Sequence, residues 1–169
     1  MLNRIPIFVL IFLLSLSLWS QNSELSASCS KPADNSTGPD RKALIAFAKQ
    51  YLGTPYLRAS IDPKKGFDCS GFVWFVFKKF HIKVPRSSME YQFLGKTLSP
   101  EEFKVGDILV FYGFRDRTYI GHVGIICEAN GMKSRFIHAS SGKAYSVTIS
   151  ELDSDGYRRR FYKCIDVIE

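Results

Sequence analysis

The chain has 169 residues, and 46% of them are hydrophobic, which is enough for one domain with a sizeable core plus a terminal segment. Its formal charge at pH 7 is +7, from 23 Lys and Arg against 16 Asp and Glu. The basic residues are scattered, and the one dense run, Arg158–Arg160, has no interleaved aromatic and glycine residues, so the pattern argues against a nucleic-acid binder. A general attraction to an anionic surface or polymer accounts for the charge.

Residues 1–20 have the pattern of an export signal. Arg4 precedes an apolar stretch, residues 5–19, that is too short and too rich in serine for a membrane span. Ser20 is a small residue suited to signal cleavage. We therefore expect a cleaved signal and no stable membrane span in the mature protein, with a retained N-terminal anchor as the alternative.

Residues 21–39 are rich in Ser, Asn, Gly and Pro and predict a flexible tether. A lipid anchor at Cys29 is weakly supported, because no aliphatic residue stands three positions before it and a polar segment separates it from the apolar stretch. The remaining residues, 40–169, are predicted to form the folded domain.

The first half of this domain is predicted to be helical. Asp40 is a suitable N-cap for a first helix, which Gly53 and Pro55 end. The apolar positions at helical spacing are Leu44, Phe47, Ala48 and Tyr51. Residues 54–66 are rich in helix breakers and predict a loop.

A second helix is predicted from Cys69 to Phe80. Nearly every residue in it is apolar, so periodicity alone does not separate a buried strand from a buried helix. The flanks favour a helix, because Asp68 is a good N-cap and Lys78 and Lys79 lie where the helix dipole is negative. A helix with so many apolar residues must lie in the core.

The second half predicts an antiparallel sheet. Pro100 starts a short capped turn over residues 99–102. Strands are expected at 108–112, near 121–128, and at 135–140, 144–149 and 158–168. Helices followed by strands, without internal repeats, indicate an α+β fold.

Asn130-Gly131 is a strong hairpin signal between the strands near 121–128 and 135–140. If the hairpin folds about Asn130, residues whose numbers add to 260 face each other, and His122 and His138 form a cross-strand pair on one face. A two-residue turn would shift this register by one and place the two imidazoles on opposite faces. The hypothesis therefore requires a turn with an odd number of residues.

These residues could form a site for cysteine nucleophilic catalysis. Cys69 would be the nucleophile, because the free N–H groups and the positive dipole end at a helix N-terminus favour its thiolate. His122 would be the general base that forms an imidazolium beside this thiolate and later protonates the leaving amine. His138 would orient His122 as the third member of a triad.

Each residue also has a purely structural interpretation. Cys69 could be a buried core cysteine, and either histidine could be a satisfied structural residue. A Cys–His–His zinc site is a further alternative, although its ligands are widely spaced. The conjunction of a capped thiol, a hairpin pair and only one other histidine, His81, favours catalysis. No phosphate-binding glycine loop or close metal-ligand spacing is present, so we expect no cofactor.

The chain has four cysteines, and three remain if Cys69 is a free nucleophile. Cys127 and Cys164 lie in strand-like segments. Small buried hydrophobic side chains are the favoured interpretation for both, with a Cys127–Cys164 disulfide as the alternative.

Six segments in a fixed order resemble the NlpC/P60 family of bacterial cell-wall cysteine peptidases. They are GTPY at 53–56, GFDCSGF at 66–72, VPRSS at 84–88 with Gln92, GDILVF at 106–111, GHVGI at 121–125 and FIHAS at 136–140. The resemblance extends from about Asp40 to Glu169. It implies a papain-like core in which the nucleophile helix packs on an antiparallel sheet. It also implies hydrolysis of peptidoglycan stem peptides, typically between γ-D-glutamyl and diaminopimelate residues.

The resemblance further implies a set of site residues. The family triad corresponds to Cys69, His122 and His138. Tyr56 matches the family tyrosine whose hydroxyl approaches the nucleophile and assists the oxyanion. Positions that line the substrate groove correspond to Asp68, Ser70 and Ser88, and Arg86 lies in the same motif as Ser88. Loop packing and a surface charge are the alternatives for Tyr56 and Arg86.

Three departures concern the substrate groove rather than the triad. Ala59-Ser60 stands where many family members have Gly-Gly, and because Ala or Ser needs ordinary backbone angles we expect a different groove wall. Gly121 replaces the small hydroxyl residue often found before the histidine. Residues 113–120 form a charged loop beside the site, with Arg115, Asp116 and Arg117.

The leading hypothesis is therefore an exported, monomeric peptidoglycan endopeptidase of the periplasm or cell envelope that acts on stem peptides. One rival is a catalytically silent wall-binding or scaffold protein with the same fold, although three intact triad residues argue against it. The other rival is a papain-like amidase or acyltransferase that uses the same triad on a different substrate.

Overall fold

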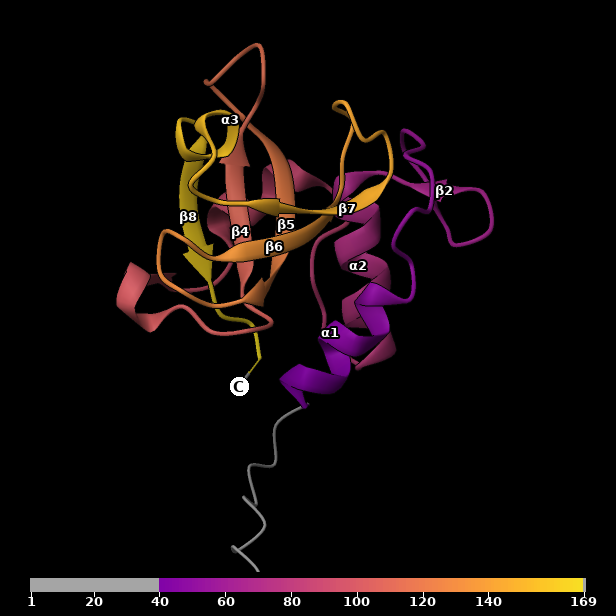
Figure 1. Ribbon diagram of the computed structural model, residues 1–169, viewed down its shortest axis with the longest axis horizontal. Coiled ribbons are helices and arrows are strands. Elements are labelled where there is room, and N and C mark those ends of the chain that lie inside the picture. The colour runs from indigo at the N-terminus through magenta and orange to yellow at the C-terminus, as the bar shows by residue number, and fades with distance from the viewer. Residues whose placement is uncertain (1–39, 169) are drawn as a thin grey trace, which may run out of the picture. The chain divides into compact units, whose positions relative to one another are not determined.

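The computed structural model describes residues 40–168, all of them in the larger of the two units into which the chain divides, Ser36–Glu169. The predicted export signal, the tether and the lipid anchor considered at Cys29 lie outside the described residues. Figure 1 shows a twisted sheet with two helices packed against one of its faces. The α+β class expected from the sequence is confirmed.

The main sheet has six strands in the order β3-β8-β4-β5-β6-β7, and every neighbouring pair is antiparallel. The strands are β3 (Thr97–Leu98), β4 (Ile108–Tyr112), β5 (Ile120–Glu128), β6 (Arg135–Ala139), β7 (Val147–Glu151) and β8 (Phe161–Ile165). β4 to β7 follow chain order, and β8 returns to pair with β4. β5 and β6, which carry the two histidines of interest, therefore lie inside the sheet.

The two main helices, α1 (Arg41–Lys49) and α2 (Cys69–Lys79), begin where the sequence predicts them. Their N-caps are Asp40 and Asp68, and each carboxylate accepts a hydrogen bond from a backbone N–H of the first turn. The capping residues fix where each helix starts, which for α2 places Cys69 at the first helical position.

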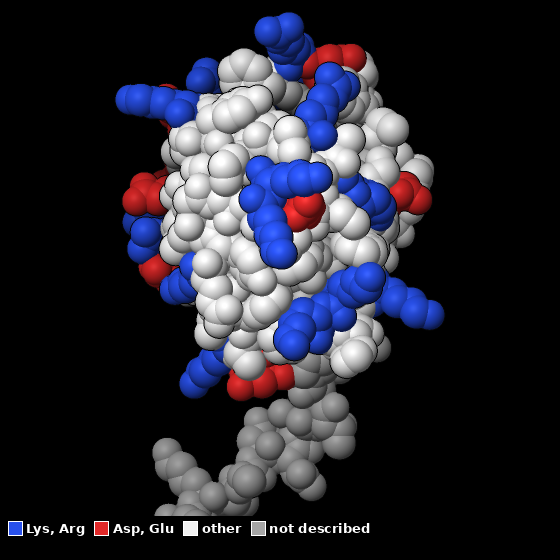
Figure 2. Space-filling view, turned by 90° about the vertical axis from the view of Figure 1, so that its right-hand side faces the viewer, with Lys and Arg blue, Asp and Glu red and all other residues white. Residues whose placement is uncertain are grey.

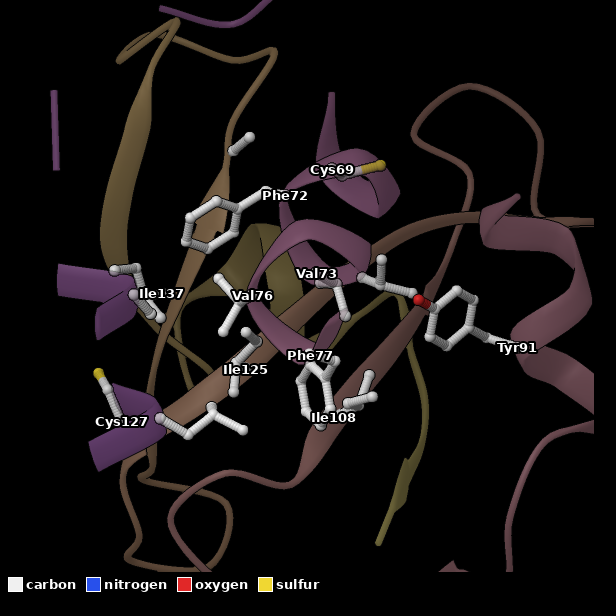
Figure 3. Close-up of a cluster of buried hydrophobic side chains, with 14 of the residues drawn as sticks. Cys69, Phe72, Val73, Val76, Phe77, Tyr91, Ile108, Ile125, Cys127 and Ile137 are labelled. Atoms are coloured by element: carbon white, nitrogen blue, oxygen red, sulfur yellow. The ribbon is translucent and has the colours of Figure 1, made fainter. Parts of the chain in front are cut away.

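The apolar face of α2 packs on the sheet. Figure 3 shows Phe72, Val76 and Phe77 of α2 against Ile125 of β5 and Ile137 of β6. All five side chains are fully buried. Burial of each large apolar side chain contributes roughly 1.5–3 kcal/mol, so this contact is a major part of the core.

A second apolar cluster lies on the opposite face of the sheet, because successive side chains of a strand point to opposite faces. Phe111, Ile126 and Phe136 belong to it, together with Leu152 and Cys164. Cys127 belongs to the helix-facing cluster, so the two cysteines are buried free thiols in different clusters. Their interpretation as small hydrophobic side chains is confirmed.

The end of the chain differs from the prediction. β7 begins at Val147 rather than at 144, and the predicted strand 158–168 is wrong in its first residues. A one-turn helix, α3 (Asp155–Arg158), precedes β8. The carbonyl of Ser154 accepts hydrogen bonds from the next turn of backbone and closes this helix. Polar, turn-forming residues at 153–156 start α3. The search for strand periodicity did not detect this turn.

Short elements also occupy the predicted loops. The segment 54–66 contains β1 (Ile61–Asp62), which pairs with β2 (Gly66–Phe67). A 3-10 turn, η1 (Ser88–Phe93), was not predicted, whereas η2 (Pro100–Glu102) was.

Within residues 40–168, no helix combines the length and apolarity that a membrane crossing requires. Figure 2 shows the face of the domain that carries the β1–β2 hairpin. Lys and Arg side chains are scattered over this face, with uncharged surface between them.

Candidate active site

The N-terminus of α2 carries the Cys69 thiol. Asp68 has extended backbone angles (φ −85°, ψ 174°), and its Oδ1 accepts a hydrogen bond from the Gly71 N–H at 2.6 Å. The helix therefore begins at Cys69, whose residue surface is 8% exposed. In Figure 3 the sulfur points away from the core residues Phe72 and Ile137.

The thiol lies where β5 and β6 separate. The β5–β6 ladder reaches Ile125 and does not continue toward the start of β5. Cys69 Sγ lies 4.0 Å from the carbonyl oxygen of Gly121, and the N–H of Val123 points to the sulfur. The thiol thus contacts the strand backbone on both sides of His122.

The two imidazoles contact each other. His122 Nε2 lies 2.9 Å from His138 Nδ1, and the rings are almost perpendicular, at 88°, with their centroids 4.8 Å apart. Both residues are buried. His138 stacks on Phe136, which places the pair on the face of the sheet opposite to α2. The hairpin brings the two histidines to one face, as the sequence predicts.

The predicted register of this hairpin is nevertheless wrong by two residues. Ile125 pairs with Ile137, so the numbers of facing residues add to 262 and not to 260. In this register His138 is not directly opposite His122. The two are diagonal neighbours, a separation that aromatic side chains can bridge.

A β-bulge explains why they still share a face. The connection between Glu128 and Arg135 has six residues, an even number that by itself would separate the imidazoles. Cys127 is an extra residue in β5 beside this connection, and it restores the parity of the register. The odd-numbered turn that the prediction required is replaced by an even-numbered turn plus a bulge.

His138 has two further partners that the sequence did not indicate. Its Nε2 lies 3.0 Å from Ser150 Oγ and 3.4 Å from the Tyr157 hydroxyl. Ser150 comes from β7 and Tyr157 from α3, the two regions whose bounds were predicted incorrectly. Neither residue belongs to a recognisable motif, so only correct strand bounds could have located them.

Burial controls the protonation of the thiol. It raises the pKa of Cys69 to about 11, and the neighbouring Asp68 adds to the rise. The backbone N–H groups of Ser70 and Val123 act in the opposite direction. The sequence-based expectation that the helix N-terminus favours the thiolate is therefore not met, because desolvation outweighs these N–H groups.

Burial also keeps both histidines neutral. It lowers the pKa of His122 well below 6.5, and the neighbouring His138 and Arg160, whose protonated forms would repel an imidazolium, lower it further. It lowers the pKa of His138 to about 3. At neutral pH the resting site holds a neutral thiol and neutral imidazoles. Among the residues that the structure describes, Cys69 Sγ lies against the Gly121 carbonyl and forms no hydrogen bond to an imidazole, so direct transfer of its proton to His122 requires the two side chains to come closer.

Asp68, Ser70 and Arg86 form one hydrogen-bonded cluster. Arg86 donates to the two carboxylate oxygens of Asp68 at 2.9 and 2.7 Å, and to Ser70 Oγ at 3.1 Å. Asp68 and Ser70 are buried, whereas the Arg86 side chain is 39% exposed. The cluster holds the start of α2, and Arg86 is its member at the surface.

Tyr56 lies near the start of α2, and Ser88 lies near β5. Tyr56 is half-buried, and burial together with the nearby Cys69 and Asp68 raises its pKa. Ser88 begins η1, and its hydroxyl donates to the carbonyl oxygen of Ile120 at 3.5 Å.

The structure accounts for two of the departures from the family pattern. Ala59 has a φ of 59°, so the expectation of ordinary backbone angles at this position is wrong. Ala59 takes the left-handed conformation that a glycine adopts without strain. At Gly121, a Cβ would lie 2.6 Å from the Cα of Gly113, so a hydroxyl residue does not fit against the charged loop.

A cleft of about 740 Å³ is lined by His122. Its walls come from the β4–β5 loop, α3 and the β6–β7 loop, which project from the same end of the sheet in Figure 1. Within the described part of the chain, no three His, Cys, Asp or Glu side chains are arranged to hold a metal ion.

The sequence model of the NlpC/P60 family matches residues 53–166. The chain belongs to the NlpC/P60 family. Its six-stranded sheet and the helix that begins at Cys69 are those of the papain-like domains of this family. A solved NlpC/P60 family protein from Bacillus cereus has a TM-score of 0.69 and 27% identity, over 78% of this chain and 41% of that chain.

Two curated relatives are similar over most of the domain. A probable endopeptidase NlpC homolog of Haemophilus influenzae is 39% identical over 121 residues, which cover 71% of this chain and 59% of that protein. A gamma-DL-glutamyl hydrolase of Bacillus subtilis is 37% identical over 118 residues, which cover 69% of this chain and 27% of that protein. The chain thus matches less than two thirds of the length of either relative.

Proposed function

We propose that the chain is an exported peptidoglycan hydrolase that cleaves stem peptides between γ-D-glutamyl and diaminopimelate residues, with Cys69 as the nucleophile. The observation that carries the proposal is the contact of this thiol with the backbone around His122, whose imidazole contacts His138 at 2.9 Å. Membership of the NlpC/P60 family supports the reaction class. The relatives named as an endopeptidase and a gamma-DL-glutamyl hydrolase support the bond.

The reaction begins as Cys69 Sγ attacks the carbonyl carbon of the scissile amide and its proton moves to His122. The step requires the tautomer in which the Nε2–H of His122 donates to His138 Nδ1, because Nδ1 of His122 is then free to accept that proton. His122 then protonates the leaving amine, and the C–N bond breaks to leave an acyl thioester on Cys69. A water molecule gives a proton to His122 and attacks the thioester. The C–S bond breaks, the acid product leaves and the thiol regains its proton.

The remaining site residues bind the acyl side of the substrate in this proposal. The Tyr56 hydroxyl donates a hydrogen bond to the developing oxyanion. Ser88 and Arg86 contact the stem peptide, since Arg86 is the partly exposed member of its cluster. Asp68 and Ser70 are buried and act by holding Arg86 in place.

The chain is organised around this activity. Residues 1–20 are a cleaved export signal, residues 21–39 a tether and residues 40–169 the catalytic domain. The enzyme acts as a monomer without a cofactor, in the periplasm or cell envelope. The basic charge of +7 favours approach to an anionic wall polymer.

The main test is digestion of diaminopimelate-type peptidoglycan by the purified, reduced chain, beside a Cys69→Ala variant, with products identified by mass spectrometry. Stem peptides cut after the γ-D-glutamyl residue by the unmodified chain alone are the expected result. Intact stem peptides in both samples would instead favour a silent wall-binding protein. Cleavage or transfer at another acyl group would favour the papain-like amidase or acyltransferase.

A further inference from the structure

Three arginines line the cleft that contains His122. They are Arg58, Arg115 of the β4–β5 loop and Arg160, which precedes β8. Among the described residues that line the cleft there is no Asp or Glu. Within residues 40–168, none of the three arginines forms an ion pair. A concave site whose only charges are positive concentrates anions.

Arg160 is held in place without being neutralised. Its Nε donates to the carbonyl oxygen of Gly156 at 2.8 Å and its Nη1 to that of Tyr112 at 3.4 Å. Its Cζ lies 5.0 Å from the centroid of the Tyr157 ring. Neutral carbonyls and an aromatic face fix the guanidinium but leave its charge available to a ligand.

The loop that carries Arg115 has a fixed base. The N–H of Gly113 donates to the carbonyl oxygen of Tyr119 at 2.9 Å and closes the loop. Gly113 also packs closely on Gly121, because a Cβ added at Gly121 would lie 2.6 Å from the Cα of Gly113. Gly121 directly precedes His122, so the loop is anchored beside the catalytic base.

The position of the cleft indicates which side of the scissile bond it would contact. In the proposed mechanism His122 protonates the leaving amine, so this amine must come within hydrogen-bond reach of the imidazole. His122 lines the cleft, whereas Cys69 and Tyr56 do not. The cleft therefore lies on the leaving-group side, next to the residue whose amine departs.

We infer that this arginine-lined cleft binds a free carboxylate on the residue whose amine leaves, which in diaminopimelate stems is the side-chain carboxylate. The inference rests on the proposed function for the identity of the peptide. Arginine matches carboxylate geometry, and charge-assisted hydrogen bonds are about twice as strong as neutral ones. An amidated side chain lacks the charge, and a lysine side chain carries the opposite one.

The test compares two synthetic stem tetrapeptides that differ only in a side-chain carboxylate or carboxamide on diaminopimelate. Their binding to the Cys69→Ala chain, which keeps the cleft and cannot form the thioester, is measured by isothermal titration calorimetry. We expect the free acid to bind about tenfold or more tightly than the amide. Adding Arg58→Gln and Arg115→Gln should reduce this ratio to about threefold or less, because both side chains contribute charge.

The matched control removes two charges elsewhere. Lys104→Gln and Lys133→Gln change exposed residues at the opposite end of the sheet, and they should leave the ratio unchanged. Equal affinities for the two peptides, binding of neither, or a ratio that survives the arginine substitutions would each overturn the inference. Hydrolysis of the free acid by the unmodified chain tests the proposed function separately. Cleavage without discrimination overturns only the carboxylate site, and discrimination without cleavage overturns only the activity.

Discussion

His122 and His138 are in contact, at 2.9 Å between Nε2 and Nδ1, although they are not paired across the β5–β6 ladder. The ladder ends at the pair of Ile125 and Ile137, and one further step in the same register would set Gly124 opposite His138. A Cβ at position 124 would lie 3.0 Å from the His138 Cβ and 2.5 Å from the Phe136 ring. The missing side chain gives His138 the space to lie diagonally toward His122.

The substitution Gly124→Ala is therefore expected to damage the site from within the strand. The added methyl group must displace Phe136 or His138, which costs about 1–3 kcal/mol of stability and misaligns the imidazole pair. We expect kcat to fall roughly tenfold to a hundredfold. Thermal unfolding and steady-state kinetics on a stem tetrapeptide measure the two effects. Unchanged kinetics would show that the diagonal contact does not depend on the space at Gly124.

The orientation of His122 is expected to depend on His138 more than on the partners of His138. His138→Ala removes the side chain that contacts His122 Nε2 and should lower kcat by about a hundredfold or more, with little change in KM. Ser150→Ala removes only an outer hydrogen bond, at 3.0 Å, and should lower kcat by about threefold to tenfold. Equal losses in the two variants would contradict this order.

The pH dependence of kcat/KM should reflect neutral groups in the free enzyme. His122 accepts a proton only when it is unprotonated, and burial, His138 and Arg160 lower its pKa well below 6.5. The acid limb should therefore lie below pH 6.5, and activity should fall as pH drops through the lowered pKa. Burial raises the pKa of Cys69 to about 11, so no thiol limb is expected between about pH 7 and 9. An acid limb at or above pH 6.5 would contradict the neutral resting pair.

The bidentate contact of Arg86 with Asp68 should contribute to stability as well as to binding. Arg86→Ala leaves the buried carboxylate at the start of α2 without its cation, and we expect a loss of about 1–3 kcal/mol in the free energy of unfolding. The control is Arg158→Ala, which breaks an exposed pair with Asp153 and should change stability by less than about 1 kcal/mol. Urea unfolding compares them. Equal losses in the free energy of unfolding would mean that the Arg86–Asp68 pair stabilises the domain no more than an exposed ion pair does.

Ala59→Gly should stabilise the domain, although glycine usually destabilises. At φ 59° the Cβ of alanine is strained by roughly 1–2 kcal/mol, which exceeds the entropy that glycine adds to the unfolded chain. We expect a gain of up to about 1 kcal/mol. The same change at Ala46, an exposed position inside α1, should instead lose about 1 kcal/mol. A loss of stability in both variants would show that alanine is not strained in the left-handed conformation at position 59.

The sequence by itself determined the parts of this protein that depend on neighbours along the chain. Asp68 as an N-cap fixes the start of α2 and hence the position of Cys69, because capping acts within one turn. The order of the six family motifs identifies the fold. The hairpin signal at Asn130-Gly131 predicts that the strands carrying His122 and His138 are neighbours, but it does not decide whether the two imidazoles share a face.

Only the tertiary structure decided the features that depend on packing between distant segments. The bulge at Cys127 sets the register of β5 and β6, and no local sequence pattern predicts this bulge. Burial reverses the expected direction of the Cys69 pKa, because desolvation depends on everything packed around the thiol. Arg58, Arg115 and Arg160 meet in one cleft although they come from three segments that are far apart in the chain. The sequence gives the number of arginines, but only the folded structure shows which of them lie close together.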